Sequence, residues 1–238
     1  YERAGGDKTL PSDLRPPPVL KRTLDYLFHE LLPQEGFEST YGFVRDRTRQ
    51  VRADFTIQMQ NDALAMECHE RCVRYHILVM HFMRTTPGFE LHMEESVLMN
   101  SLQSLKEFYA DQRGQYASPC ELEIRIYHRL IHMRDQRERH DDIPDEIRNH
   151  SAFLLTSQFR EHVQKVSSPI QKNSPLKVGD EGMLIFNQLA AVLREQGNRV
   201  MIYLVACIFE RFFGPEKIED IDSLRVGMDL SQIIDGAA

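Results

Sequence analysis

The most informative part of the sequence is residues 72–83, which read CVRYHILVMHFM. On a helix, at about 100° per residue, these apolar side chains cover almost the whole circumference. The charged residues of the surrounding segment fill the narrow arc that remains. A helix that is apolar nearly all round is buried between neighbours rather than laid on a surface. We therefore expect residues 62–84 to form a helix enclosed by other helices.

The flanking sequence repeats a helical period on both sides of this segment. Residues 41–59 carry an apolar stripe at i, i+4, i+7, i+11 and i+15, formed by Val44, Thr48, Val51, Phe55 and Met59. Similar patterns predict helices over residues 19–32, with Pro33 as the stop, and over 93–113, 151–166, 180–196 and 198–213. No segment alternates with a period of two, so the expected fold class is all-α.

Residues 118–121, SPCE, give the clearest helix start in the chain. Ser118 is the expected N-cap, Pro119 the first helical residue and Glu121 the partner of a capping box. Beyond them, one apolar face contains Leu122 and Ile126 and a second contains Ile124. A helix with two apolar faces has two sets of neighbours. This pattern favours antiparallel helical hairpins stacked as a superhelix.

The expected domain organisation is a single helical domain with short flanking segments. Residues 1–17 form an extended lead-in, because consecutive prolines prevent a helix from starting earlier. Residues 18–225 form the domain, and residues 167–179 have the composition of a mobile loop. Residues 226–238 follow as a tail.

Composition narrows the classes of function. The chain has 238 residues and a formal net charge of −7, which excludes a strongly basic coat for nucleic acid. Arginine outnumbers lysine by 22 to 7, and its planar guanidinium suits ion pairs and contact surfaces. The catalytic phosphate-loop, dinucleotide, nucleophile-elbow and zinc-protease motifs do not occur in the sequence.

Two groups of residues could nevertheless carry chemistry. Cys68, Cys72 and His76 recur every four residues, so one side of a helix could present them to zinc; alternatively they are core residues. Arg45, Arg49 and Arg52 fall within an arc of about 60° on their helix. They could meet phosphates or an acidic partner, or they could pair with neighbouring acids. The loop lysines that could touch nucleic acid are Lys165, Lys172 and Lys177.

Four segments together resemble the SAC/GANP domain of nuclear mRNA-export scaffolds. They are SDLRPP at 12–17, FVRDRTRQVRADFT at 43–56, ERCVRYH at 70–76 and CELEIRIY at 120–127. The resemblance covers about residues 12–225 and is weaker after Ser167. The residues that match the family pattern are Arg15, Pro16, Pro17, Asp46, Arg47, Arg49, Arg52, Asp54, Phe55, Glu70, Arg71 and Arg74.

The resemblance implies a scaffold subunit of the transcription-and-export complex at the nuclear pore, known as TREX-two. In this family the domain is a PCI-like helical superhelix followed by a winged helix. It pairs with a PCI-domain subunit, and a small acidic disordered protein shared with the proteasome lid joins them. The assembled platform binds RNA or DNA. The winged helix is expected to be largely absent from this chain, with residues 226–238 as its start.

The resemblance also implies a location in the nucleus, at the nuclear envelope and its pores, through regions outside this chain. No catalytic residue, no cofactor and no bound metal are expected here. In longer family members acetyltransferase activity is ascribed to a different region. We interpret the matching arginines as holding the fold. Replacing Arg49 or Asp54 with alanine is therefore expected to lower the melting temperature.

The main hypothesis is thus a non-enzymatic scaffold for mRNA export that does not insert into membranes. Two alternatives remain open at this point. One is a nucleic-acid-binding module that acts alone through Arg45, Arg49, Arg52 and the three loop lysines. The other is a metal-dependent enzyme built on Cys68, Cys72 and His76.

Overall fold

The computed structural model describes residues 10–135 and 143–236. Within these ranges every regular element is a helix and no strand occurs, which confirms the all-α fold class. The α-helices are α1 (Pro17–Asp25), α2 (Leu32–Ile57), α3 (Ala63–Phe82), α4 (Leu91–Asp111), α5 (Glu121–Ile131), α6 (Asp145–Arg148), α7 (Ser151–Ser167), α8 (Gly179–Glu195), α9 (Arg199–Phe213) and α10 (Leu230–Asp235). The shorter turns are η1 (Pro11–Asp13), η2 (Tyr26–Leu31), η3 (Pro215–Lys217) and η4 (Ile221–Arg225).

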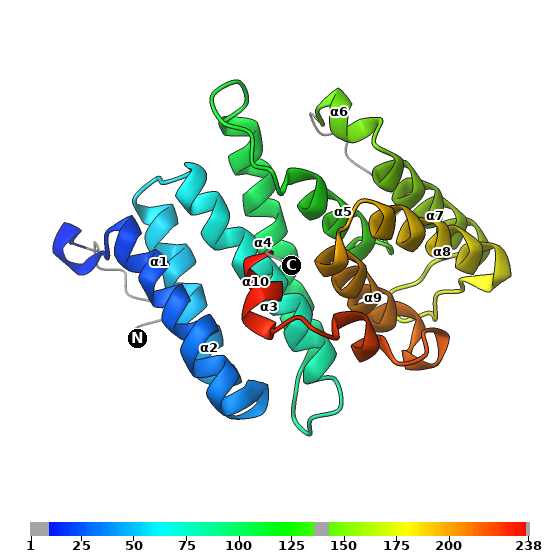
Figure 1. Ribbon diagram of the computed structural model, residues 1–238, viewed down its shortest axis with the longest axis horizontal. Helices are drawn as coiled ribbons and strands as arrows, with labels where there is room; N and C mark the ends of the chain where they lie inside the picture. Colours follow the sequence, from blue (N-terminus) through cyan, green and yellow to red (C-terminus); the bar gives the residue numbers. More distant parts are fainter. Residues whose placement is uncertain (1–9, 136–142, 237–238) are drawn as a thin grey trace.

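The helices form a row of packed neighbours, with α1 and α2 at one end and α7 and α8 at the other (Figure 1). Helix α3 lies between them and contacts α1, α2, α4, α9 and α10. Helix α5 contacts α4, α7 and α9 and so joins the middle of the row to the end with α7 and α8. The final helix, α10, returns to the middle of the row and packs on α3 and η2. The stacked arrangement agrees with the expected helical superhelix.

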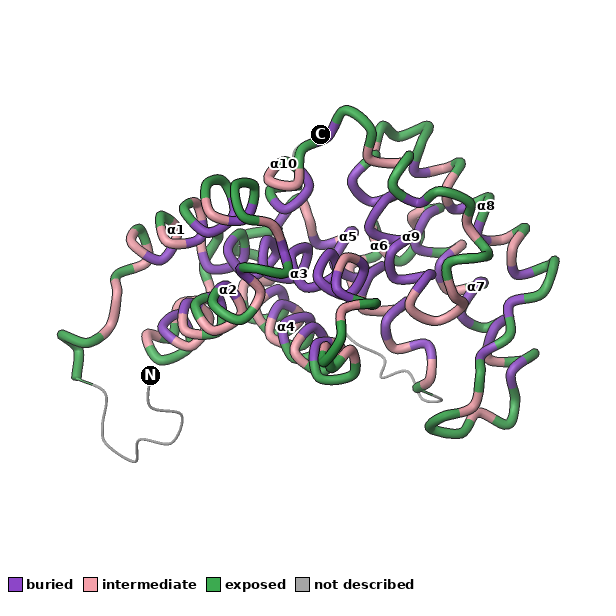
Figure 2. Tube along the Cα trace, turned by 90° about the horizontal axis from the view of Figure 1, so that it is seen from below, coloured by how far each residue is buried: buried purple, intermediate pink, exposed green. Residues whose placement is uncertain are grey.

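Helix α3 is buried along most of its length, as residues 72–83 predict. Every residue from Cys68 to His81 is buried, and Figure 2 shows the same burial along α9. The core around them contains aromatic side chains such as Tyr75, whose ring lies against Phe28, and Tyr203, whose ring lies against His81; both tyrosines are fully buried. Full burial of one large apolar side chain contributes about 1.5–3 kcal/mol. The row of helices is therefore held by these two central members.

The first helix does not end at Pro33, so that expectation is wrong. Helical structure continues past Pro33 and breaks at Gly36, whose φ of 78° and ψ of 173° are outside the helical region. The element η2, which ends two residues before Pro33, is a π-helix. A proline lacks the N–H that an α-helix requires, and the wider π turn accommodates it. Glycine takes the positive φ without a side-chain clash.

Ser118 is not the N-cap of α5, which begins at Glu121 with Cys120 as its cap. The Ser118 hydroxyl donates instead to Glu70 Oε1 at 2.6 Å and accepts from the Cys120 N–H at 3.2 Å. Tyr109 OH donates to the same Glu70 oxygen at 2.8 Å. A buried carboxylate needs such donors. The tertiary contact with α3 therefore overrides the local capping pattern.

Arginines of α3 hold α10 at its carboxyl end. Arg71 lies 2.9 Å from a carboxylate oxygen of Asp25 and 2.9 Å from one of Asp235. Arg74 Nη1 donates to the Ile234 carbonyl at 3.1 Å. A cation is favoured at a helix carboxyl end, where carbonyl groups lack partners. Residues 226–236 are thus packed on the helical core; the start of a winged helix stays a prediction, and residues 1–9 of the lead-in and 237–238 of the tail lie outside the described residues.

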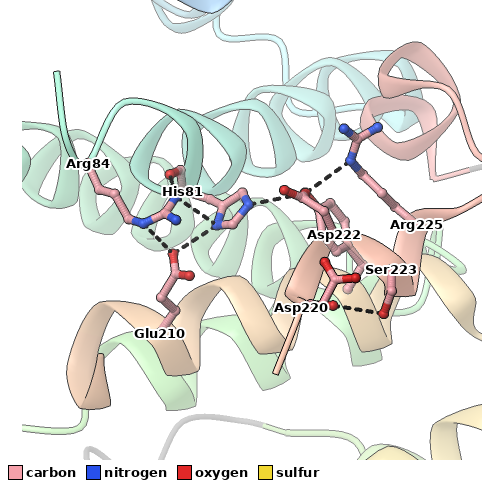
Figure 3. Close-up of polar contacts among 8 residues, drawn as sticks. His81, Arg84, Glu210, Asp220, Asp222, Ser223 and Arg225 are labelled. Atoms are coloured by element: carbon pink, nitrogen blue, oxygen red, sulfur yellow. Dashed lines mark hydrogen bonds and ion pairs between the residues drawn. The ribbon is translucent and has the colours of Figure 1, made fainter. Parts of the chain in front are cut away.

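A second polar group joins α3 to α9 and η4 (Figure 3). The His81 ring lies 2.8 Å from Glu210 through Nδ1 and 3.3 Å from Asp222 through Nε2. Arg84 Nε is 3.3 Å from Glu210, and Arg225 Nε donates to Asp222 at 3.2 Å. Glu210 thus contacts two side chains from the carboxyl end of α3 and the turn after it. Asp222 contacts one side chain from α3 and one from its own element, η4. This network fixes the register of α3 against α9.

Replacing Arg74 with alanine is expected to lower the free energy of unfolding by about 3–5 kcal/mol, because Glu123 would remain buried without its cation. Arg74 is 1% exposed, and its Nε donates to Glu123 at 2.8 Å. Urea unfolding followed by circular dichroism measures the loss. Arg47→Ala, an exposed control, is expected to cost less than about 0.5 kcal/mol. A double variant, Arg74→Met with Glu123→Gln, should lose less than Arg74→Ala; an equal or greater loss contradicts this explanation.

Candidate functional site

A cleft between α2 and α4 gathers three of the residues that the sequence singles out. Its volume is about 360 Å³. Arg45, Arg49 and Arg52 line one wall at i, i+4 and i+7 of α2, next to the apolar stripe that is buried in the core. We call this site the arginine cleft. Its remaining lining residues are Asp46, Ala53, Thr56, His69, Val97, Asn100 and Ser104.

Arg45 lies close to the buried carboxylate of Glu94 at one end of the arginine cleft. Its Nε is 3.8 Å from Glu94 Oε2, a long contact, and its side chain is 27% exposed. Glu94 accepts from His76 Nδ1 at 2.5 Å and from Tyr41 OH at 3.0 Å. Burial opposes the charge of Glu94, but the His76 and Tyr41 donors outweigh it and lower the pKa of this carboxyl. Burial also lowers the pKa of His76, so a neutral ring donates to a carboxylate.

Arg52 occupies the deeper part of the cleft. Its Nη1 donates to Ser101 Oγ of α4 at 2.5 Å. Its Nε is buried without a hydrogen-bond partner, and within the described residues Arg52 forms no ion pair with a carboxylate. Burial lowers the pKa of Arg52, although arginine stays protonated at neutral pH. In the part of the chain described here, the cleft therefore contains a buried guanidinium that hydrogen-bonds to a neutral hydroxyl and has no carboxylate in direct contact.

Arg49 stands at the exposed mouth of the cleft, and His69 of α3 forms part of its floor. His69 is 2% exposed, its Nδ1 bonds to the Ala65 carbonyl at 2.8 Å, and its ring meets Phe108 edge-on. Burial lowers the pKa of His69 to about 4. The floor is therefore neutral at physiological pH, and the positive charge of the cleft comes from its arginines.

The three loop lysines lie elsewhere. Lys165 is near the end of α7, and Lys172 and Lys177 are in the connection from α7 to α8, all exposed. These elements are at the opposite end of the row from α2 (Figure 1). The structure thus brings the arginines together but does not join the lysines to them. That connection is partly anchored, since Ser167 Oγ accepts from the Lys177 N–H at 2.8 Å; its expected mobility stays a prediction.

Comparison with known proteins gives a family for this chain. The model of the SAC3/GANP family matches residues 1–232. The chain is 37% identical over 220 residues to "SAC3 family protein 1" of Schizosaccharomyces pombe, across 88% of this chain and 21% of that protein. It belongs to the SAC3/GANP family.

Two further relatives are more distant. "SAC3 family protein B" of Arabidopsis thaliana is 25% identical over 261 residues, covering 98% of this chain and 14% of its own length. "Protein xmas" of Drosophila melanogaster is 28% identical over 228 residues, covering 90% of this chain and 10% of its own. The chain therefore spans about a fifth or less of the length of these relatives.

Several residues of the SAC3/GANP pattern brace the fold. Asp54 of α2 is 2% exposed and accepts from Arg15 Nε at 2.9 Å and from Gln50 Nε2 at 2.7 Å. Gln58 donates to the Arg15 carbonyl at 2.8 Å. These bonds attach the segment before α1 to α2, and Pro16 and Pro17 then start α1. Phe55 is fully buried, and Glu70, Arg71 and Arg74 make the α3 contacts described above.

Arg47 and Arg49 do not share that internal role in the described structure. Arg47 is exposed and lies over the Phe43 ring, 5.3 Å from its centroid. Arg49 is exposed at the cleft. One arginine-rich block of the SAC3/GANP pattern thus supplies both a brace, through Asp54, and a solvent-facing wall.

Cys68, Cys72 and His76 are all buried in α3. Burial raises the pKa of the Cys68 thiol and raises that of Cys72 to about 11, so neither is a thiolate at neutral pH. The His76 Nδ1 is occupied by Glu94. Over residues 10–135 and 143–236, no three His, Cys, Asp or Glu side chains are placed to hold a metal ion. The geometry favours the interpretation of these residues as core.

Sequence reasoning missed the two buried α4 residues that contact arginines of the cleft. Glu94 and Ser101 lie on the same helical stripe as the apolar Leu98 and Leu105, and both are fully buried. A carboxylate and a hydroxyl on an apolar stripe are a signal, because buried polar groups must find partners. Those partners, Arg45 and Arg52, come from a helix some fifty residues earlier, which helical periodicity does not reveal.

Asp54→Ala is expected to lower the free energy of unfolding by about 2–3 kcal/mol, because Arg15 and Gln50 lose a shared, buried, charged acceptor. Arg49→Ala, on the same helix but exposed, should change it by less than about 0.5 kcal/mol. Urea unfolding of the three proteins provides the comparison. Equal losses in the two variants would mean that Arg49 is a brace as well.

The buried His69 predicts an acid-sensitive step. Its pKa is about 4 in the folded chain and about 6.5 when unfolded. The unfolded chain therefore binds the proton first, so stability is complete above pH 6.5 and falls as the pH drops towards 4. For this group the loss is on the order of 3 kcal/mol.

The measurement is the pH dependence of urea unfolding for the natural chain and His69→Gln. His76 and His128, whose pKa burial also lowers, are present in both proteins, so the difference between the two slopes isolates His69. A His69→Gln slope equal to that of the natural chain would contradict the assignment.

Proposed function

We propose that this chain is a non-enzymatic scaffold of a nuclear mRNA-export complex. The observation that carries the proposal is the extent of the family match: residues 1–232 include the whole described helical stack except its final residues. The similarity to relatives of the SAC3/GANP family supports the same role in mRNA export. The interior is consistent with this role, because buried charges such as Arg74 and Glu123 join one helix to another.

The proposed partners follow from the family. They are a PCI-domain subunit and a small acidic disordered subunit shared with the proteasome lid. The assembled complex, rather than this chain alone, would bind RNA or DNA, with this chain contributing part of the surface. The proposed location is the nucleus and its pores, with attachment to the pore through regions outside this chain. Among residues 10–135 and 143–236, no helix has both the length and the apolarity that crossing a bilayer requires.

Rigidity is the physical property that supports a scaffold role. Helix α3 is enclosed by five other helices, and side chains from its middle and its carboxyl end contact other elements, through the Arg71–Asp235 ion pair and the His81–Glu210 hydrogen bond. A platform that is already ordered loses little conformational entropy when a partner binds. Surfaces on α2 and α8, at opposite ends of the row, are thus held at a fixed separation for different partners.

The test is co-expression of the 238-residue chain with a PCI-domain subunit and the small acidic subunit. We expect one complex with a single copy of each chain, measured by size-exclusion chromatography with light scattering at physiological salt. An unrelated helical-repeat protein of similar length, expressed with the same two subunits, is the control. Elution of the SAC3/GANP chain as a free monomer, as for the control, would contradict the proposal.

A further inference from the structure

We propose that the arginine cleft binds the oxyanion of an acidic segment of a protein partner, through Arg45, Arg49 and Arg52. The oxyanion is a side-chain carboxylate or a phosphoryl group. The inference deepens the proposed scaffold function and rests on it for the existence of a protein partner. Oxyanion binding itself is a property of this chain that can be measured without any other subunit.

The first argument is a buried arginine without a direct carboxylate contact. Two buried arginines of α3 each face a carboxylate: Arg71 faces Asp235 and Arg74 faces Glu123, at 2.9 and 2.8 Å. Arg52 has a neutral hydroxyl, Ser101, in that role, and its Nε is buried without an acceptor. A buried charged donor without an acceptor is costly, and an incoming oxyanion would remove that cost.

The second argument is the presence of further guanidinium groups in the same lining. Arg45 Nε is also buried without a hydrogen-bond partner, since Glu94 is 3.8 Å away and already accepts from His76 and Tyr41. Arg49 is exposed at the mouth of the same cleft. Guanidinium groups bind carboxylates and phosphates in pairs of parallel hydrogen bonds. Three of them along one wall make a receptor for a single anionic group.

The opposite wall is suited to the same ligand. It consists of Val97, Asn100 and Ser104, which follow one face of α4. The Asn100 amide can donate to an oxyanion, while Ser104 donates within the helix to the Asn100 carbonyl at 3.1 Å. Asp46 is one acidic residue in the lining, against the three arginines. The described lining is therefore positively charged, although the whole chain is negative.

The geometry favours an acidic protein segment over nucleic acid. A nucleic-acid groove follows the backbone with successive cations and stacks bases on aromatic rings. Of the residues that the structure describes, no Phe, Tyr or Trp lines this cleft. The exposed lysines at 165, 172 and 177 lie at the other end of the row, so they do not extend the charge into a track. A cleft of about 360 Å³ accommodates one anionic side chain with its neighbours.

The test is fluorescence anisotropy with the 238-residue chain and three labelled probes. The probes are a hexaglutamate peptide, a peptide of equal length with one phosphoserine among neutral residues, and a uridine octamer. The variants are Arg49→Glu and Arg52→Gln, and Arg47→Glu on an exposed part of α2 outside the cleft is the matched control. Circular dichroism verifies that every variant is folded.

We expect saturable binding of at least one peptide, weakened on the order of tenfold by Arg49→Glu and by Arg52→Gln. Arg47→Glu should stay within about twofold of the natural chain, because its charge is outside the cleft. Tighter binding of hexaglutamate identifies a carboxylate ligand, and tighter binding of the phosphoserine peptide identifies a phosphoryl ligand. Both results support the proposal.

Three results would overturn it. They are the absence of binding to both peptides, an equal loss of affinity in Arg47→Glu, and tighter binding of the uridine octamer with the same dependence on Arg49 and Arg52. Co-expression of Arg49→Glu with the PCI-domain subunit separates this inference from the scaffold role. A variant that keeps that subunit but loses the acidic peptide leaves the scaffold proposal intact and supports a distinct site.

Discussion

The whole structure depends on enclosing α3, a helix that is apolar around most of its surface yet carries charged side chains into the interior. Arg74 and Glu123 form a buried ion pair, and His81 forms a buried hydrogen bond with Glu210. Breaking such an ion pair is strongly destabilising, because it leaves one charge buried alone. The first contact joins α3 to α5 and the second joins it to α9, so these polar contacts specify which helices meet while apolar burial supplies the driving force.

The sequence was sufficient for the fold class and for most helices, because each long helix has a strong apolar period. It failed at Pro33 and Ser118, where a local rule competed with something non-local. A π turn accommodates the proline before the break at Gly36, and the Ser118 hydroxyl donates to a buried glutamate as well as accepting from the Cys120 N–H. Helical periodicity describes which face of a helix is buried but not which distant side chain it will meet. Its errors are therefore concentrated where backbone geometry or a tertiary hydrogen bond decides the outcome.

The same distinction applies to the site. The spacing of Arg45, Arg49 and Arg52 predicted a shared face correctly, and the structure shows them in one cleft. The sequence could not distinguish paired from unpaired arginines, since their partners come from other helices. It grouped Arg49 with Asp54, whereas one is exposed and the other is a buried acceptor for Arg15. A single block of a family pattern can therefore contain both residues that stabilise the fold and residues that are exposed for contact with a partner.

The return of α10 to the middle of the row places it away from α8. Its carboxyl end lies against Arg74, and Arg71 and His29 hold Asp235. Helix α10 therefore covers part of α3 in the middle of the row, whereas α8 has an exposed side at one end (Figure 1). A molecule that packs on α8 and one that packs on α10 would use separate surfaces.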